Sequence, residues 1–312
     1  MAYNILIDVP LPAAIIEMLG PGFNLHLIDE TPAAEWGRID ALFTYSHPII
    51  DGAFMDRLPN MKLISNFGVG VDHIDLDAAK QRGLPVGNTP SLLDGATADM
   101  TIALMLATAR NMIIGDRFAR SAEFTHYDPS ILMGYEVHST TLGIIGMGNI
   151  GYQVARRALA FDMQVLYHNR RPNTAAEAKL DVTYTALDDL LTQADFVALN
   201  TPLTPETTNL IGRRELSLMK ETAFLVNTAR GGVVDHDALY EALTTGQIAG
   251  AGLDVTEPEP LPRDHPLLGL DNVVIMPHLG SCTRQTRQAM AQRAIDNLKA
   301  GLEERDLITR VA

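Results

Sequence analysis

The chain has 312 residues, of which 46% are hydrophobic and 20% are charged, and this is the length and composition of about two globular domains. Its formal net charge of −14 argues against nonspecific binding to nucleic acid or to anionic membranes, so any anionic ligand must be held by local cationic groups. The single cysteine, Cys282, excludes an intrachain disulfide and fits a reducing compartment.

The N-terminal residues lack the basic stretch and cleavage site of a signal peptide. The longest apolar run, residues 100–109, is shorter than the roughly 20 residues that span a bilayer. We therefore expect a cytoplasmic protein with neither a membrane nor a nucleic-acid partner.

Strand-length apolar runs alternate with helix-length periodic segments along the whole chain, which predicts an α/β protein with largely parallel sheets. In the first third, strands are expected at residues 4–8, 24–28, 41–44, 63–65 and 85–87. Helices are expected at 11–19 and 75–82, followed by a long helix at about 92–111 with apolar residues on more than one face.

A glycine motif then opens a second series of elements: Gly146-Met147-Gly148-Asn149-Ile150-Gly151. An apolar segment precedes it and a helical pattern follows from Ile150. In this strand–turn–helix context the first glycine allows a tight turn, the second lets a dinucleotide pyrophosphate approach the backbone, and the third allows close packing of helix on strand. The alternative is a glycine-rich turn without a ligand.

Further strands are expected at 142–146, 164–168, 196–200, 224–227, 250–255 and 273–276, and a last amphipathic helix at about 284–303. The simplest arrangement returns this helix to the first domain. We therefore predict two doubly wound, Rossmann-like parallel-sheet domains, with the cofactor domain inserted into the substrate domain. The predicted substrate domain is 1–97 with 281–312, and the predicted dinucleotide-binding domain is 98–280.

The strand at 164–168 ends in Asn169-Arg170-Arg171 and has no carboxylate at the position where NAD-binding sheets hold the ribose 2′-hydroxyl. An acidic residue would repel a 2′-phosphate, whereas a guanidinium binds one. These three residues therefore predict NADPH as the preferred cofactor, with NADH as the alternative. The competing interpretation is a solvated loop.

Three later segments each end a strand with polar groups, at the sheet edge where ligands of such folds bind. They supply an arginine, an acid and a histidine, which carbonyl reduction requires. A single arginine, acid or histidine after a strand is usually structural. The acid is Glu259 or, as the alternative in the same loop, Glu257. The histidines show no metal-ligand spacing, so no metal site is expected, and a thiol hydrolase built on Cys282 lacks an orienting partner.

At these segments the chain resembles the D-isomer-specific 2-hydroxyacid dehydrogenase family, over nearly its whole length. The resemblance rests on NTARG, then DVxxxEP, then PHxGS, all downstream of GxGxxG. It implies that Arg230 anchors the substrate and polarises its ketone, that His278 is the acid/base and also contacts the substrate, and that Glu259 is the partner of His278. It also implies that the backbone of Val69 and Gly70 binds the substrate carboxylate, although Gly68 and Gly70 could merely serve a tight turn.

The resemblance further implies cofactor contacts along the sheet edge. Asp254 is placed near the nicotinamide carboxamide, and Thr201, Pro202 and Thr207 along the cofactor wall. The remaining implied contacts are Thr97, Thr228, Ala229 and Gly280. A homodimer is implied too, with residues 111–138 as the contact arm.

Together with Thr97-Ala98-Asp99, the arginine-containing strand end resembles the glyoxylate/hydroxypyruvate reductase branch. We therefore expect NADPH-dependent reduction of small 2-oxo acids (glyoxylate, hydroxypyruvate or 2-ketogluconate) to D-2-hydroxy acids. The alternatives are an NAD-dependent phosphoglycerate dehydrogenase-type enzyme and a non-enzymatic dinucleotide-sensing regulator.

Overall fold

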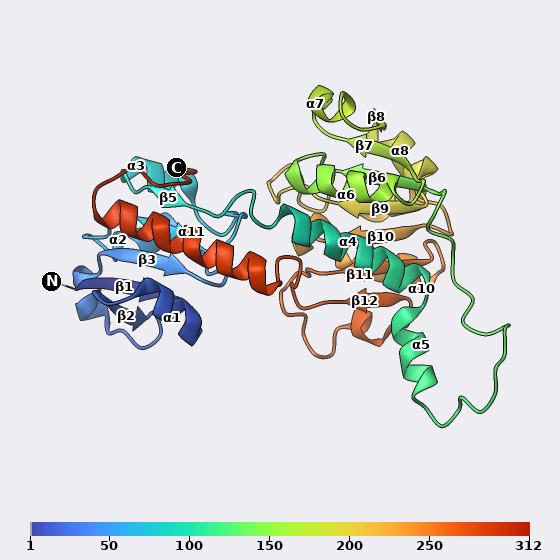
Figure 1. Cartoon of the computed structure of the whole chain (residues 1–312), viewed down its shortest axis with the longest axis horizontal. Coiled ribbons are helices and arrows are strands. Elements are labelled where there is room, and N and C mark those ends of the chain that lie inside the picture. The colour runs from blue at the N-terminus through green and yellow to red at the C-terminus, as the bar shows by residue number, and fades with distance from the viewer. Residues whose placement is uncertain (1) are drawn as a thin grey trace. The chain divides into compact units, whose positions relative to one another are not determined.

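The computed structural model describes residues 2–312, and contacts divide the chain into two compact units. One unit runs to Leu93 and includes Thr283–Ala312, and the other is Asp94–Cys282 (Figure 1). Both boundaries lie within four residues of the predicted ones. The first boundary lies before the predicted one because helix α4 starts at Asp94 and packs on the strands of the second unit.

The first unit is a five-stranded parallel sheet in the order β2-β1-β3-β4-β5. Its core includes Leu6, Leu42 and Ile64, which are fully buried side chains of neighbouring strands. The C-terminal helix α11 packs on β3, β4 and β5 of this sheet (Figure 1), and Ser65 Oγ donates to Ala294 O at 2.7 Å. The strands are β1 Tyr3–Ile7, β2 Phe23–Leu27, β3 Ala41–Thr44, β4 Ile64–Asn66 and β5 Val86–Gly87; the helices are α1 Ala13–Leu19, η1 Ala33–Arg38, α2 Gly52–Asp56, α3 Leu76–Gln81 and α11 Arg284–Leu302.

The second unit is a seven-stranded parallel sheet in the order β12-β11-β10-β9-β6-β7-β8. Its strands are β6 Thr141–Ile145, β7 Gln164–His168, β8 Val182–Tyr184, β9 Phe196–Leu199, β10 Phe224–Asn227, β11 Gly250–Leu253 and β12 Val273–Ile275. Its helices are α4 Asp94–Ala109, α5 Met112–Ala119, α6 Asn149–Leu159, α7 Thr174–Glu177, α8 Leu187–Gln193, α9 Arg213–Leu218, η2 Gly231–Val233, α10 His236–Thr244 and η3 Pro266–Gly269.

Alternation along the strands of the second unit builds a separate core on each face of the sheet. In β9, Phe196 and Ala198 pack in the core that α4 and α6 cover, whereas Val197 and Leu199 pack in the core under α8, α9 and α10. A sheet covered on both faces is the doubly wound arrangement, so the predicted fold class is confirmed.

The structure differs from the prediction at one expected helix and at one strand that was not expected. The long helix expected at 92–111 ends at Ala109, because Asn111 adopts a left-handed conformation (φ 51°) and a separate helix, α5, begins at Met112. The edge strand β8 was not predicted, since three residues are too few to show alternation. Within residues 2–312, no helix is long and apolar enough to cross a membrane.

Candidate functional site

The glycine loop joins β6 to α6 at the point where the strand order of the second sheet reverses between β6 and β9. Gly146 has φ 103°, and a Cβ there would lie 2.6 Å from the backbone carbonyl carbon of Asn200. A Cβ on Gly151 would lie 2.2 Å from the carbonyl oxygen of Gly146. These two glycines are therefore required by the protein's own backbone packing.

Gly148 differs from the other two glycines, because a Cβ at this position would meet no atom within 4 Å. It is the N-cap residue of α6 in an extended conformation that other residues also adopt, so the protein itself does not require a glycine here. Open space at the start of a helix, at the switch point of a parallel sheet, fits a bound pyrophosphate. Residues 146–151 thus have the shape that a dinucleotide needs.

Asn149, within the loop, lies beside Asp94 at the start of α4. Burial raises the pKa of Asp94, and the hydrogen bond with the Asn149 side chain partly offsets that shift. The side chain of Asn149 is therefore oriented from within the second unit.

The end of β7 carries the residues predicted to select the cofactor. Arg170 and Arg171 are exposed. The pKa of the Glu206 carboxyl is lowered mainly by the hydrogen bond with Thr204 and further by the charge of Arg170. Asn169 has another function, because its Oδ1 accepts the N–H of Met147 at 2.7 Å. It therefore holds the glycine loop, which was not predicted.

The 201–207 loop follows β9 and is folded by its own threonine. Thr207 Oγ1 donates to Pro202 O at 2.7 Å and accepts from the Thr204 N–H at 2.8 Å. The N–H nitrogen of Thr201 lies 2.8 Å from the place where a Cβ on Gly146 would be, so this predicted cofactor wall starts directly at the glycine loop.

His278 and Glu259 contact each other at the carboxyl edge of the second sheet. The Nδ1 of His278 lies 2.9 Å from Glu259 Oε1, and the two side chains are 29% and 36% exposed. Glu259 follows β11 and His278 follows the neighbouring strand β12, so sheet order brings them together. Glu259, rather than Glu257, is thus the carboxylate at His278.

Asp254 holds the backbone on which His278 sits. Its Oδ1 and Oδ2 accept the N–H groups of Leu279 and Gly280, both at 2.7 Å, and its carbonyl accepts the N–H of His278 at 2.8 Å. Asp254 is 1% exposed, and His278 has φ 56°. Within the protein this predicted cofactor residue fixes the histidine loop.

Arg230 follows β10, which pairs with β11 on the side opposite to β12. Asn227 shapes its turn: Nδ2 donates to Arg230 O at 2.8 Å and Oδ1 accepts from the Ala229 N–H at 3.0 Å. A Cβ on Gly231 would lie 2.0 Å from the carbonyl carbon of Thr256, which brings the arginine turn against the loop after β11. Arginine, glutamate and histidine therefore lie on three consecutive strand ends.

The remaining predicted contacts of the second unit lie beneath these strand ends. Thr228 Oγ1 is 2.8 Å from Thr101 Oγ1 on α4, and a Cβ on Gly280 would meet Thr97 Cγ2 at 3.3 Å. Thr97 and Thr228, which were predicted as cofactor contacts, are both buried.

In the first unit, Val69 and Gly70 follow β4 in a loop in which three consecutive carbonyls accept hydrogen bonds from asparagine side chains. Asn66 Nδ2 donates to the carbonyls of Gly68 and Gly70 at 3.1 and 2.9 Å, and Asn88 Nδ2 donates to Val69 O at 2.9 Å. Among residues 2–312 no hydrogen bond to another backbone or side-chain group uses the N–H of Val69 or Gly70. Consecutive N–H groups presented in this way form an anion-binding concavity.

The D-isomer specific 2-hydroxyacid dehydrogenase NAD-binding domain matches residues 102–280. The chain belongs to this family. It is 46% identical to a glyoxylate reductase of Pyrococcus furiosus over 266 residues, 84% of this chain and 79% of that protein. A glyoxylate reductase of Thermococcus onnurineus is 43% identical over 96% of this chain and 93% of its own length.

Solved structures of this dehydrogenase family superpose over almost the entire chain. One is the NADPH-dependent glyoxylate/hydroxypyruvate reductase of Sinorhizobium meliloti in complex with NADP and malonate, with TM-score 0.91, 32% identity and coverage of 100% of this chain and 97% of that chain. Another is D-lactate dehydrogenase of Aquifex aeolicus with NAD and lactic acid, with TM-score 0.89, 30% identity and coverage of 99% and 98%.

Several residues around the dehydrogenase site were not singled out from the sequence. Asn66, Asn88, Asn173 and Asn227 each hold the backbone of a predicted site segment through a side-chain amide. Their only signal in the sequence is an asparagine at or just after a strand end or, for Asn173, at a helix N-cap, and both also describe ordinary turns.

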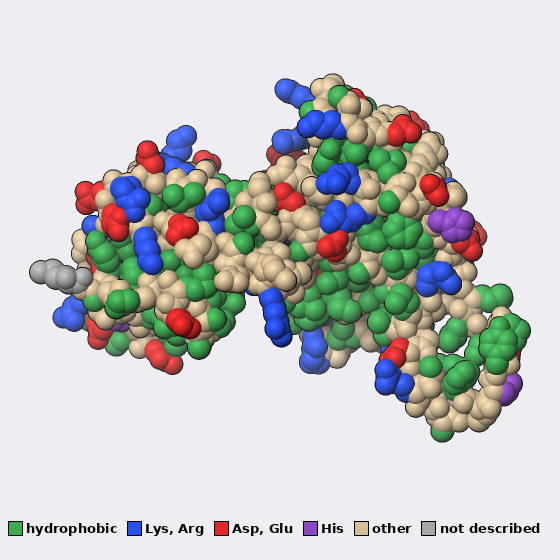
Figure 2. All heavy atoms as spheres, viewed as in Figure 1, with side chains coloured by type: hydrophobic (Ala, Val, Ile, Leu, Met, Phe, Trp, Pro, Cys, Tyr) green, Lys and Arg blue, Asp and Glu red, His purple; other side chains and the backbone are tan. Residues whose placement is uncertain are grey.

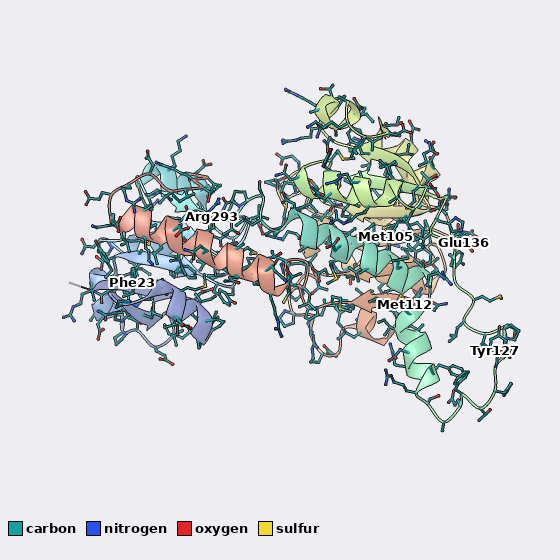
Figure 3. All side chains as sticks on the ribbon, in the orientation of Figure 1. Phe23, Met105, Met112, Tyr127, Glu136 and Arg293 are labelled. Carbon is teal, nitrogen blue, oxygen red and sulfur yellow. The ribbon has the colours of Figure 1, made fainter. Side chains whose placement is uncertain are left out.

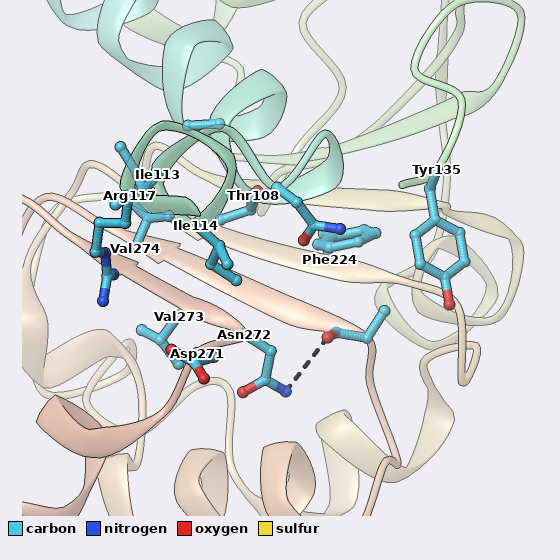
Figure 4. A pocket seen from close by; sticks show the side chains of 13 residues that line it. Thr108, Ile113, Ile114, Arg117, Tyr135, Phe224, Asp271, Asn272, Val273 and Val274 are labelled. Atoms are coloured by element: carbon cyan, nitrogen blue, oxygen red, sulfur yellow. Dashed lines mark hydrogen bonds between the residues drawn. The ribbon is translucent and has the colours of Figure 1, made fainter. Parts of the chain in front are cut away.

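A hollow of about 50 Å³ lies elsewhere in the second unit, at the base of α5 (Figure 4). Thr108, Ile113, Arg117, Tyr135 and Phe224 are among the residues that line it, together with residues 271–274. It contains none of the predicted catalytic or cofactor residues. Within residues 2–312, no group of three or more His, Cys, Asp or Glu side chains is arranged to hold a metal ion.

Proposed function

We propose that this protein catalyses the NADPH-dependent reduction of small 2-oxo acids to D-2-hydroxy acids, with glyoxylate and hydroxypyruvate as the main substrates and 2-ketogluconate as a larger one. The 2.9 Å contact between His278 and Glu259, on the strand ends next to that of Arg230, carries the proposal. Relatives 43–46% identical to this chain bear the name glyoxylate reductase, which supports the substrate class.

In this reaction the proton has a defined route. Because Glu259 engages Nδ1, the proton that reaches the substrate oxygen leaves from Nε2 of His278. The guanidinium of Arg230 polarises the ketone and binds the carboxylate of the acid. When bound, the reduced nicotinamide supplies the hydride that joins the carbonyl carbon, so hydride and proton together convert C=O into CH–OH.

The N–H groups of Val69 and Gly70 hold the substrate carboxylate in this proposal. The hydrogen-bonded carbonyls of the loop support it, since Asn66 and Asn88 leave the N–H side of the loop to an anion.

The preference for NADPH rests on Arg170 and Arg171 and on the missing carboxylate after β7. The NADP-bound Sinorhizobium meliloti reductase supports it, whereas the NAD-bound D-lactate dehydrogenase keeps NADH as the weaker alternative. Replacing both arginines by Ala should raise KM for NADPH far more than KM for NADH. Equal increases would reject this assignment.

The proposed assembly is a homodimer formed through the arm, residues 111–138. Tyr127 is 81% and Met133 is 75% exposed, and Met112 and Phe124 are about half exposed. Figure 2 shows hydrophobic side chains gathered on this segment, and Figure 3 shows Tyr127 on the loop that extends beyond α5. An apolar surface of this kind suits a second copy of the chain.

The double variant Tyr127→Ser/Met133→Ser should be a monomer where the wild-type protein is a dimer, and analytical sedimentation measures the mass of each. An unchanged mass would count against this arm.

One panel of rates tests the activity: glyoxylate, hydroxypyruvate, 2-ketogluconate, pyruvate and phosphohydroxypyruvate, each with NADPH and with NADH. Fast reduction of phosphohydroxypyruvate with NADH would indicate a phosphoglycerate dehydrogenase-type enzyme instead, and no turnover with any acid would indicate a regulator. His278→Ala should abolish turnover while NADPH affinity is retained.

We place the enzyme in the cytoplasm, where the exposed thiol of Cys282 stays reduced.

A further inference from the structure

The segment from Asn169 to Asn173 is tied to the glycine loop at one residue, Met147. Asn169 Oδ1 accepts the Met147 N–H at 2.7 Å, and Asn173 Nδ2 donates to Met147 O at 2.8 Å. Met147 lies between the first two glycines of the motif, and Arg170 and Arg171 lie between the two asparagines. Both backbone polar groups of one glycine-loop residue are thus held by the residues on either side of the arginine pair.

The same segment is also anchored to the core of the second unit. Tyr167 is fully buried, and its hydroxyl accepts the Asn173 N–H at 2.7 Å and donates to Glu177 Oε1 at 2.9 Å. Burial raises the pKa of Tyr167, so the hydroxyl stays a neutral donor. Tyr184 adds a hydrogen bond from its hydroxyl to Asn169 O at 3.2 Å. The ends of the segment are therefore fixed on two sides.

These bonds restrict the backbone while the arginine side chains remain exposed. Pro172 further limits the chain between the two fixed points. A loop ordered before its ligand arrives loses less conformational freedom on binding than a mobile one. The gain applies to the ligand group that the loop contacts, which in the proposed function is the 2′-phosphate.

We propose that Asn169 and Asn173 are positioning residues for cofactor selectivity: together they hold the arginine pair and the pyrophosphate loop in one fixed geometry. This inference rests on the proposed preference for NADPH and adds two residues that act through their hydrogen bonds to Met147. It predicts that selectivity for the 2′-phosphate falls when the bond to Met147 is lost, even though both arginines remain.

Asn173→Ser isolates this bond. Serine keeps the N-cap function of Asn173, whose Oδ1 accepts the Ala176 N–H at 3.1 Å, but it is too short to reach Met147. Calorimetry then measures Kd for 2′,5′-ADP and for 5′-AMP in wild type and variant. Loss of one ordering hydrogen bond should reduce the preference for 2′,5′-ADP about fivefold. Asn169→Ser, which removes the other bond to Met147, should give a reduction of similar size.

Asn60→Ser is the matched control, because Asn60 Nδ2 also donates to a backbone carbonyl, Gly37 O at 2.6 Å, but in the first unit. It should leave both Kd values unchanged. If the preference for 2′,5′-ADP over 5′-AMP is unchanged in both Asn173→Ser and Asn169→Ser, whether or not affinity falls, this inference is overturned and the proposed cofactor preference is not. A wild-type protein that binds 2′,5′-ADP no better than 5′-AMP would overturn the proposed cofactor preference first.

Discussion

The two functions of the glycine loop can be separated by placing the same methyl group at Gly148 or at Gly151. At Gly148 a Cβ meets nothing within 4 Å, and the backbone (φ −87°, ψ −156°) is allowed for alanine. Alanine is a poorer N-cap residue than glycine, but it also lowers the entropy of the unfolded chain. The two effects are each about 0.5–1 kcal/mol and opposite in sign, so the melting temperature without ligand should change by no more than about 2 °C.

At Gly151 the same methyl group lies 2.2 Å from Gly146 O, whereas real Cβ contacts stay beyond 3.0 Å. The obstacle is backbone, so the helix and the loop must separate by close to 1 Å. Overpacking of this kind costs about 1–3 kcal/mol, which corresponds to a fall in Tm of roughly 2–12 °C for a protein of this size.

Calorimetric melting and titration with NADPH measure both effects. We expect Gly148→Ala to keep its Tm but to bind NADPH at least about tenfold more weakly, equivalent to about 1.4 kcal/mol, because the methyl group takes the space of the pyrophosphate. Gly151→Ala should lose both stability and affinity. Wild-type affinity in Gly148→Ala would refute the placement of the pyrophosphate, and a Tm as low as that of Gly151→Ala would refute the steric reasoning.

Three further predictions concern buried polar groups. Asp254→Asn replaces one of two acceptors of backbone N–H groups with a donor, so urea unfolding should show a loss of about 1–3 kcal/mol and kcat should fall as the His278 loop shifts. Asn88→Ala frees Val69 O; KM for glyoxylate should rise about fivefold while the Kd of NADPH stays constant, and a rise in both would indicate general damage. Burial lowers the pKa of His236, which therefore stays neutral in the fold while the unfolded chain takes up a proton below about pH 6.5. Stability should thus fall with pH below that value, by at most about 1.4 kcal/mol per pH unit, and His236→Asn should show a shallower decline in Tm between pH 7.5 and 5.5.

Most strands could be predicted because each is an apolar run with clear ends. The expected strand at 164–168 coincides with β7, and those at 41–44 and 224–227 coincide with β3 and β10. The helix expected at 92–111 was slightly too long, because α4 starts only at Asp94 and the left-handed conformation of Asn111 separates it from α5. Hydropathy alone does not register a single left-handed residue.

The grouping of Arg230, Glu259 and His278 was predictable from motif order, because consecutive strand ends meet at one sheet edge. Side-chain amides that support the site were not predictable. Asn88 and Val69 are 19 positions apart, and Asn173 and Met147 are 26 apart. Such pairs depend on strand register, which one sequence does not reveal.

The two ends of the second unit lie close together within that unit. A Cβ on Gly280 would be 3.3 Å from Thr97 Cγ2, and the unit itself spans Asp94–Cys282. A domain whose ends adjoin can be inserted into a host, or removed from it, with little disturbance. We therefore expect residues 94–282 to be transferable as a module, and a short linker from Leu93 to Thr283 would leave the first unit as a continuous chain.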